Sequence, residues 1–189
     1  QETYPNVTLE RVDLTPTFET MKAALPNNAA QATVDLALAN TRARLRMTTL
    51  YYLAGLHGRL VAGTGNKVED FGVGFFTKYG DGGVDLSPIA DLTKSEVYEL
   101  AKALNVVDSI MKAKPTDGLF GDDRSDEDQI GASYPELEWA MALRDSGSEP
   151  ADLSERQRKV LAIFDRRRAA NRHKMVAIPV CVIPQALRS

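Results

Sequence analysis

The segment from Leu60 to Lys67 has the composition of a ligand-binding loop. An apolar run, Leu-Val-Ala, is followed by Gly63-Thr64-Gly65-Asn66-Lys67. Open α/β sheets bind ligands at the carboxyl ends of their strands, where glycines let the backbone approach the ligand closely. Short Gly-x-Gly sequences also occur in plain turns, so this motif alone leaves both interpretations open.

A second segment, from Phe76 to Asp85, contains one lysine, two aromatic residues and two aspartates among glycines. Its sequence is Phe-Thr-Lys-Tyr-Gly-Asp-Gly-Gly-Val-Asp. A hairpin-like turn would not account for so many polar and aromatic groups together, so the composition favours a binding loop. Glu69 and Asp70 precede this loop, where their oxygens are suited to Mg²⁺ held together with substrate phosphates. The alternative for these two acids is a solvated surface.

The residue types that are scarce exclude several kinds of chemistry. The sequence has two histidines, His57 and His173, and one cysteine, so a zinc site or a His-based or Cys-based triad is not expected. Cys181 lies in the apolar run 178–183, which predicts a buried, inert thiol. There are 26 acidic and 23 basic residues, a balance that argues against a dedicated nucleic-acid binder. No apolar run approaches the roughly 18 residues of a membrane helix, so we expect a cytoplasmic protein with no membrane or nucleic-acid partner.

The elements that position these residues follow an α/β pattern. Leu36, Ala39, Ala43, Met47, Leu50 and Ala54 are spaced three or four apart, which predicts a helix over 31–54 with this stripe in the core. Thr93 and Glu96 form a capping box that begins a helix ending near 105. The other expected elements are a strand at 7–14, a helix at 17–25, a buried parallel strand at 60–62, a mobile loop at 114–128, helices at 133–144 and 154–173, and an extended tail at 178–183.

The arginines of the 31–54 helix separate by angle. At about 100° per residue, Arg42 and Arg46 lie on one flank of the apolar stripe and Arg44 lies on the other. Periodicity alone favours a solvated basic face for this set. The many basic residues of the last helix likewise indicate a solvated or charge-paired face, because no aromatic side chains interleave with them for base stacking.

Seven motifs follow one another along the chain: Asn40–Met47, Gly63–Glu69, Phe75–Asp85, Leu92-Thr93-Lys94, Lys114–Leu119, Asp126-Glu127 and His173-Lys174. In this order they resemble ammonia-dependent NAD⁺ synthetase. The resemblance covers about 38–174, and the string Phe-Thr-Lys-Tyr-Gly-Asp-Gly-Gly is highly specific to that family.

The resemblance implies a ligase in which the nicotinate carboxylate of deamido-NAD⁺ attacks the α-phosphate of MgATP and ammonia then displaces AMP. Such chemistry depends on cations and positioning more than on a general base, and no catalytic residue of that kind is predicted. The residues implied by the family motifs are Thr64, Lys94 and Thr116 for ATP, Glu69 for Mg²⁺, and Arg44, Lys78, Asp85, His173 and Lys174 for deamido-NAD⁺. One extra residue between Glu69 and Lys78 leaves Asp70 as the alternative metal ligand.

The resemblance also implies the fold, a doubly wound parallel sheet like that of the adenine-nucleotide alpha hydrolases. The family's first strand and its Ser-Gly-Gly-x-Asp-Ser pyrophosphate loop have no match here, and the chain begins at Gln1. We therefore expect a single domain, 1–189, that is the C-terminal portion of a synthetase domain and is inactive alone. The alternative is a non-catalytic dinucleotide-binding or subunit-interaction module.

The resemblance also implies a homodimer. The candidate interface is the 31–54 helix, because Tyr51-Tyr52 extends beyond the core stripe. Ammonia is the expected nitrogen donor, and only upstream sequence decides whether a glutamine amidase domain is present.

Overall fold

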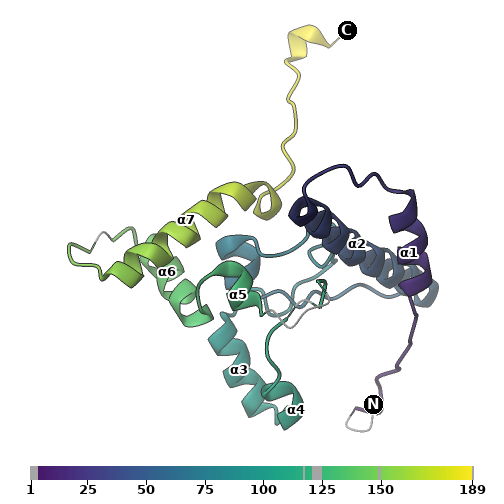
Figure 1. Ribbon diagram of the computed structural model, residues 1–189, viewed down its shortest axis with the longest axis horizontal. Coiled ribbons are helices and arrows are strands. Elements are labelled where there is room, and N and C mark those ends of the chain that lie inside the picture. Colours follow the sequence, from purple (N-terminus) through teal and green to yellow (C-terminus); the bar gives the residue numbers. More distant parts are fainter. Residues whose placement is uncertain (1–3, 117, 121–124, 149, 189) are drawn as a thin grey trace.

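The computed structural model describes residues 4–116, 118–120, 125–148 and 150–188, and its regular structure is almost entirely helical (Figure 1). The helices are α1 (Thr15–Ala24), α2 (Gln31–His57), the π-helix η1 (Val68–Val73), α3 (Lys94–Ala103), α4 (Asp108–Met111), α5 (Asp126–Ile130), α6 (Tyr134–Ser146), α7 (Glu155–Met175) and the 3₁₀ turn η2 (Gln185–Leu187). The helix predicted at 17–25 thus begins two residues earlier, and the one predicted at 31–54 continues to His57, where Gly58 ends it in a left-handed conformation.

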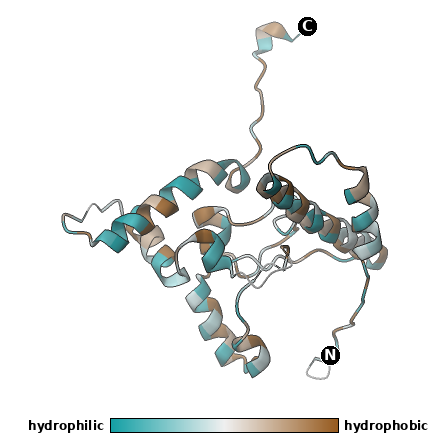
Figure 2. Cartoon of the chain, viewed as in Figure 1, coloured by the Kyte–Doolittle hydropathy of each residue, from teal (hydrophilic) through white to brown (hydrophobic). Residues whose placement is uncertain are grey.

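The main hydrophobic core lies where η1, α6 and α7 meet. Leu137 of α6, Phe164 of α7, and Val68 and Val73 of η1 are fully buried. Figure 2 shows that the helices carry both hydrophilic and hydrophobic stretches, as amphipathic helices packed on one side do. This core fixes η1, and the chain on both sides of η1 carries the candidate site residues.

The long helix α2 packs more sparsely than its sequence predicts. Ala39 and Ala43 are buried, but Leu36 and Leu50 are 55% and 52% exposed, so the prediction that the whole apolar stripe is core is wrong at those positions. The middle of α2 is covered because the segment 74–85, which we call the glycine-rich loop, comes close to it, with Gly80 packed against Ala43. On another side of α2, the guanidinium of Arg42 lies 4.1 Å from the ring centroid of the buried Phe18 of α1.

The expected parallel sheet is represented in the described residues by one isolated bridge, between Ala62 and Leu86. Gly63 N donates to Leu86 O at 2.8 Å, and Asp85 N donates to Val61 O at 2.9 Å. The predicted strand at 60–62 is therefore a single bridge, with Leu60 68% exposed, and the segment predicted as a strand at 7–14 has no regular structure up to the start of α1. A parallel strand gains its hydrogen bonds from neighbours on both edges, and the described chain supplies a neighbour on one edge only.

The helix starts follow local sequence closely. Thr93 and Glu96 form the predicted capping box of α3, and Ser133 with Glu136 forms one at α6. A further box, Ser125 with Asp128, begins α5 inside the segment predicted as a mobile loop, so that prediction is wrong for its last residues. Of the remainder of that loop, residues 117 and 121–124 lie outside the described residues.

The C-terminal segment after α7 extends away from the body of the protein (Figure 1). Cys181 is exposed, which corrects the prediction of a buried thiol. The apolar run around it is extended but packs on no core, and Val180 and Val182 are 81% and 79% exposed. Among the described helices, none is both long enough and apolar enough to span a membrane.

Candidate functional site

The glycine loop 63–67 is built to present Glu69. Asn66 is 2% exposed, and its Oδ1 accepts hydrogen bonds from the backbone N–H groups of Val68 and Glu69, each at 3.1 Å. A Cβ on Gly65 would lie 2.1 Å from Oδ2 of Asp70, so a larger residue there would require the Asp70 carboxyl group to move. The loop is therefore a packed connection from the parallel bridge into η1, and it holds Glu69 and Asp70 in different surroundings.

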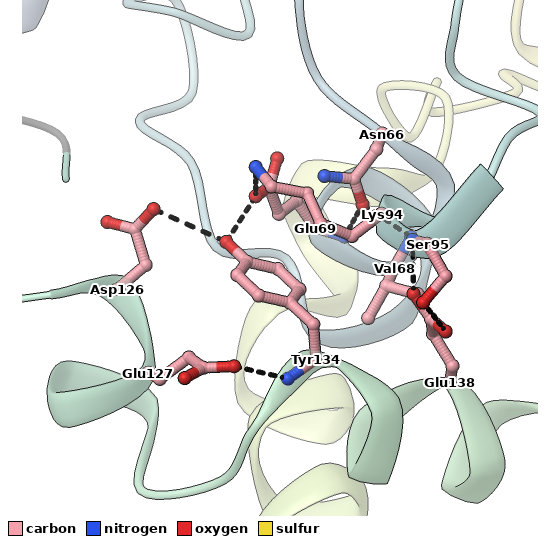
Figure 3. A network of polar contacts seen from close by, with 9 residues as sticks. All are labelled: Asn66, Val68, Glu69, Lys94, Ser95, Asp126, Glu127, Tyr134 and Glu138. Atoms are coloured by element: carbon pink, nitrogen blue, oxygen red, sulfur yellow. Dashed lines mark hydrogen bonds and ion pairs between the residues drawn. The ribbon is translucent and has the colours of Figure 1, made fainter. Parts of the chain in front are cut away.

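Four side chains from separate parts of the chain, Glu69, Lys94, Asp126 and Tyr134, meet in one group that we call the carboxylate cluster (Figure 3). Lys94 Nζ lies 3.1 Å from Glu69 Oε1, and the two side chains are 22% and 14% exposed. The Tyr134 hydroxyl donates to the same Glu69 oxygen and lies 3.3 Å from Asp126 Oδ2. Lys94 Nζ also lies 4.8 Å from the centroid of the Tyr134 ring. The idea that Glu69 is a solvated surface acid is thus wrong.

The electrostatics of these groups differ. Burial, with Glu69 and Asp126 beside it, raises the pKa of Tyr134 well above its usual range, so the phenol keeps its proton and acts as a donor. Burial also raises the pKa of Asp70 to about 6, and the nearby Glu69 and Asp81 carboxylates add to the shift. Asp70 consequently favours the protonated form more than an ordinary aspartate does, whereas Glu69 faces the Lys94 ammonium.

The acidic segment 125–128 supports this cluster instead of forming a loop. Glu127 Oε1 accepts a hydrogen bond from the backbone N–H of Tyr134 at 2.8 Å. Asp126 N donates to Pro115 O at 3.2 Å, which ties α5 to the segment that carries Thr116. Sequence reasoning did not single out Tyr134, and the motif Asp126-Glu127 carried no role. Tyr134 is 65 residues from Glu69, and no spacing rule connects them.

A second group, which we call the basic cluster, consists of Arg44, Lys78, His173 and Lys174. Arg44 Nε donates to Lys78 O at 3.3 Å, and Lys78 Nζ donates to His173 O at 2.6 Å. Lys174 Nζ donates to two carbonyl oxygens of the glycine-rich loop, Gly74 at 3.0 Å and Phe76 at 2.8 Å. Burial lowers the pKa of Lys174. Residues from α2, the glycine-rich loop and the end of α7, which the family motifs named, therefore lie close together.

The other arginines of α2 point elsewhere, as their helix angles predict. Arg42 donates to Leu119 O at 2.7 Å, and Arg46 donates to Gly118 O at 3.4 Å. Both therefore contact the segment that follows Thr116, whereas Arg44 contacts the basic cluster. This confirms the separation of Arg44 from Arg42 and Arg46.

Two adjoining cavities lie beside the basic cluster and the glycine loop. The larger, about 530 Å³, is lined by Lys174, Phe76 and Asn171, among other residues. The smaller, about 290 Å³, is lined by Thr64, Gly63, Gly80 and Gly83, among other residues. Asp81 and Leu119 line both cavities, so the two are neighbours.

Asp85 and Thr116, two of the predicted binding residues, belong to neither cluster. Asp85 accepts hydrogen bonds from the Tyr51 hydroxyl at 3.0 Å and from Val61 N at 2.8 Å, so its carboxylate braces α2 against the parallel bridge. Thr116 is exposed, and its Oγ1 accepts a hydrogen bond from Gly118 N at 3.2 Å.

The donor set around Glu69 fits a divalent cation only in part. Within the described ranges, no three His, Cys, Asp or Glu side chains are grouped so that they could hold a metal ion. Mg²⁺ is commonly held by one or two carboxylates together with substrate phosphates and water. Glu69 therefore fits as one ligand of a metal that a phosphate group also binds.

A parallel bridge that leads through a glycine loop into a helical turn is typical of α/β proteins, in which ligands bind at the carboxyl ends of parallel strands. The chain's structural neighbours are consistent with the fold of the adenine-nucleotide alpha hydrolases. Residues 5–177 match the NAD synthase family, and the chain belongs to that family.

The relatives support the same conclusion. The chain is 45% identical over 128 residues to the NH₃-dependent NAD⁺ synthetase of Methanococcoides burtonii, covering 67% of this chain and 47% of the relative. It is 36% identical over 172 residues to that of Methanosarcina mazei, covering 89% of this chain and 66% of the relative. The chain thus spans about half to two thirds of the length of these relatives.

Solved structures agree at the level of fold. The NMN synthetase of Francisella tularensis superposes with a TM-score of 0.72 at 30% identity, covering 92% of this chain and 65% of that one. The NH₃-dependent NAD synthetase of Campylobacter jejuni superposes with a TM-score of 0.68 at 25% identity, covering 90% of this chain and 64% of that one.

Proposed function

We propose that this chain is the C-terminal portion of an ammonia-dependent NAD⁺ synthetase domain and acts as part of that ligase. In the proposed reaction the carboxylate of deamido-NAD⁺ attacks the α-phosphate of ATP and pyrophosphate leaves. Ammonia then attacks the acyl-adenylate, giving NAD⁺ and AMP. The observation that carries the proposal is the pairing of Lys94 with Glu69 at the N-terminus of α3, within a chain of the NAD synthase family.

The carboxylate cluster has the properties of a site for ATP phosphates. Lys94 is the first residue of α3, where backbone N–H groups and the helix dipole favour an anion. The proposed ATP residues are Lys94, Thr64 and Thr116, and Glu69 is the proposed Mg²⁺ ligand. When bound there, Mg²⁺ would neutralise phosphate charge. Asp70 is the weaker alternative, because its oxygens face Gly65 and its raised pKa disfavours the carboxylate.

The basic cluster has the properties of a site for the anionic dinucleotide. The proposed residues are Arg44, Lys78, Asp85, His173 and Lys174. Lys78 uses one of its three ammonium hydrogens for the His173 carbonyl, which leaves others to reach a ligand. Charged donors held next to aromatic rings suit a phosphate and a nicotinate ring together. The rings of Phe76 and Tyr79 lie 5.4 Å and 5.5 Å from the Lys174 and Lys78 ammonium groups.

The proposal also covers the sheet, the oligomeric state, the partners and the location of the protein. The parallel bridge at Ala62 would be one part of a doubly wound parallel sheet whose other strands lie in the rest of the domain. A homodimer is proposed with α2 at its interface, because Tyr52 and Leu56 are 68% and 64% exposed on that helix. The partners are ATP, deamido-NAD⁺ and ammonia, with no nucleic acid or membrane, and the location is the cytoplasm.

The test measures NAD⁺, AMP and pyrophosphate formed by the whole protein from ATP, ammonium and deamido-NAD⁺, with nicotinate mononucleotide as a second substrate because one structural neighbour is an NMN synthetase. Lys94→Ala should lower NAD⁺ formation at limiting ATP about tenfold or more, the size of one lost charge-assisted contact. Lys102→Ala is the matched control, since Lys102 is an exposed lysine of the same helix and lies in none of the proposed sites. Dinucleotide binding without pyrophosphate release would favour the non-catalytic module instead.

The division into two sub-sites has its own test. Lys78→Ala should weaken deamido-NAD⁺ binding in calorimetry and leave ATP binding nearly unchanged. The opposite pattern would exchange the two sub-sites.

A further inference from the structure

Tyr134 contacts both members of the Lys94–Glu69 pair, through two different parts of its side chain. The hydroxyl donates to Glu69 Oε1, and the ring lies under the Lys94 ammonium at 4.8 Å (Figure 3). A phenol is well suited to this double role because its hydroxyl is a donor and its ring face attracts a cation. Tyr134 is 4% exposed, so neither contact is made by a freely moving surface side chain.

The backbone of Tyr134 is held where its side chain is needed. It is the first residue of α6, its N–H donates to Glu127 Oε1 at 2.8 Å, and it lies between the two residues of the Ser133–Glu136 capping box. The hydroxyl lies 3.3 Å from Asp126 Oδ2, so α5 contacts both ends of the tyrosine.

Helix α6, which carries Tyr134, also contacts the N-terminus of α3, which carries Lys94. Glu138, one turn after Tyr134, accepts hydrogen bonds from the backbone N–H of Ser95 at 2.9 Å and from its hydroxyl at 2.7 Å. Ser95 directly follows Lys94. The N-terminus of α3 is therefore fixed against α6 by two separate residues of α6.

We propose that Tyr134 is a positioning residue of the ATP site, whose hydroxyl orients Glu69 and whose ring holds Lys94 beside it. The inference rests on the proposed function, in which Glu69 and Lys94 act on ATP. Without Tyr134, Glu69 loses a hydrogen-bond donor and the Lys94 side chain can adopt more rotamers. The two groups are then no longer held in the single geometry that binding of the ATP phosphates and their metal requires. Tyr134 itself touches neither substrate in this role.

Two substitutions separate the two contacts. Tyr134→Phe removes the hydroxyl and keeps the ring, whereas Tyr134→Leu removes both. Tyr98→Phe, on α3, is the matched control, because the Tyr98 hydroxyl makes no hydrogen bond within the described part of the chain. The KM for ATP, the KM for deamido-NAD⁺ and kcat are measured on the whole protein, and MgATP and MnATP binding are measured by calorimetry.

We expect Tyr134→Phe to raise the KM for ATP about tenfold, the effect of one hydrogen bond to a charged group, and to leave the KM for deamido-NAD⁺ unchanged. Tyr134→Leu should raise it further, and Tyr98→Phe should have no effect. Equal changes in both KM values, or a loss of kcat alone, would overturn the positioning role. Urea unfolding of each variant shows which of them fold. If Tyr134→Leu does not fold, Tyr134→Phe decides the question.

A readout that needs no ligand separates this inference from the proposed function. The rate at which an acylating reagent modifies Lys94, followed by mass spectrometry with Lys67 and Lys102 as internal references, reports how firmly its ammonium is held. Tyr134→Leu should increase the Lys94 rate several-fold relative to the references, and an unchanged rate would refute the inference. If Lys94 becomes more reactive but no form of the protein makes NAD⁺, the proposed function fails while the positioning of the pair stands.

Discussion

Replacing Lys174 by methionine tests whether the end of α7 holds the glycine-rich loop in place. The Lys174 ammonium donates to Gly74 O at 3.0 Å and to Phe76 O at 2.8 Å, and Gly74 is the residue at which η1 ends. Methionine keeps the aliphatic length of the side chain and removes both hydrogen bonds. The change therefore isolates the ammonium contacts from packing.

The size of the effect follows from two opposing contributions. A hydrogen bond to a charged group contributes about 1.5–3 kcal/mol, and two are lost. Burial lowers the pKa of Lys174, which shows that the ammonium loses hydration in the folded state and that part of the hydrogen-bond energy offsets this loss. We expect the free energy of unfolding to fall by about 2 kcal/mol, or Tm to fall by about 4–8 °C for a chain of this size.

The assay is urea-induced unfolding of the chain followed by circular dichroism. Lys159→Met is the control, because Lys159 is an exposed lysine of the same helix. Lys78→Met is a second comparison, since its exposed ammonium makes one hydrogen bond, to His173 O, and we expect a loss of about 1 kcal/mol or less. If Lys174→Met unfolds at the same urea concentration as the Lys159 control, Lys174 does not brace the loop and its place at the cavity serves ligands alone.

Three further predictions concern the core, the glycine-rich loop and an ion pair. Phe164→Ala should lower the free energy of unfolding by about 3–5 kcal/mol in urea titrations because its ring is fully buried in the main core, and a loss under 1 kcal/mol would contradict that packing. Gly74→Ala should cost at least about 1–2 kcal/mol in thermal unfolding, since φ is +63° and a Cβ would lie 2.5 Å from Cβ of Asn171; an unchanged Tm would show that the loop relaxes freely. Hydrogen bonds from Arg156 lower the pKa of Glu136 to about 2, so its stabilisation is complete above its unfolded pKa near 4.5 and is lost as pH falls toward 2. Because the pair is largely solvent-exposed we expect about 1 kcal/mol or less, seen as a stability difference from Glu136→Gln at pH 7 that disappears near pH 2, and a difference that grows in acid would be the wrong sign.

Local sequence predicted the helices well because helix formation depends on near neighbours. The Thr93–Glu96 capping box and the apolar spacing after it place α3 within two residues of its observed end. The Ser154 cap begins α7 where expected, and Gly58 ends α2. In each case the deciding hydrogen bonds join residues no more than four or five positions apart, so the printed sequence contains both partners.

Local sequence could not predict the strands or whether the C-terminal apolar run is buried. A strand at Val61 requires hydrogen-bonding partners from distant segments, and the described chain supplies only Asp85 and Leu86. Cys181 sits in an apolar run, yet burial depends on whether another surface covers that run, and no described segment packs over it well enough to bury it.

For the candidate site, the family motifs of the sequence named Lys94, Glu69 and the four members of the basic cluster as candidates. Tertiary structure decided that Lys94 pairs with Glu69, that Asp70 turns toward Gly65, and that Tyr134 completes the cluster. The physical reason is the range of the interactions. A hydroxyl and a carboxylate 65 residues apart become hydrogen-bonding partners only because the packing of η1 against α6 and α7 brings their backbones together, and no local propensity encodes that approach.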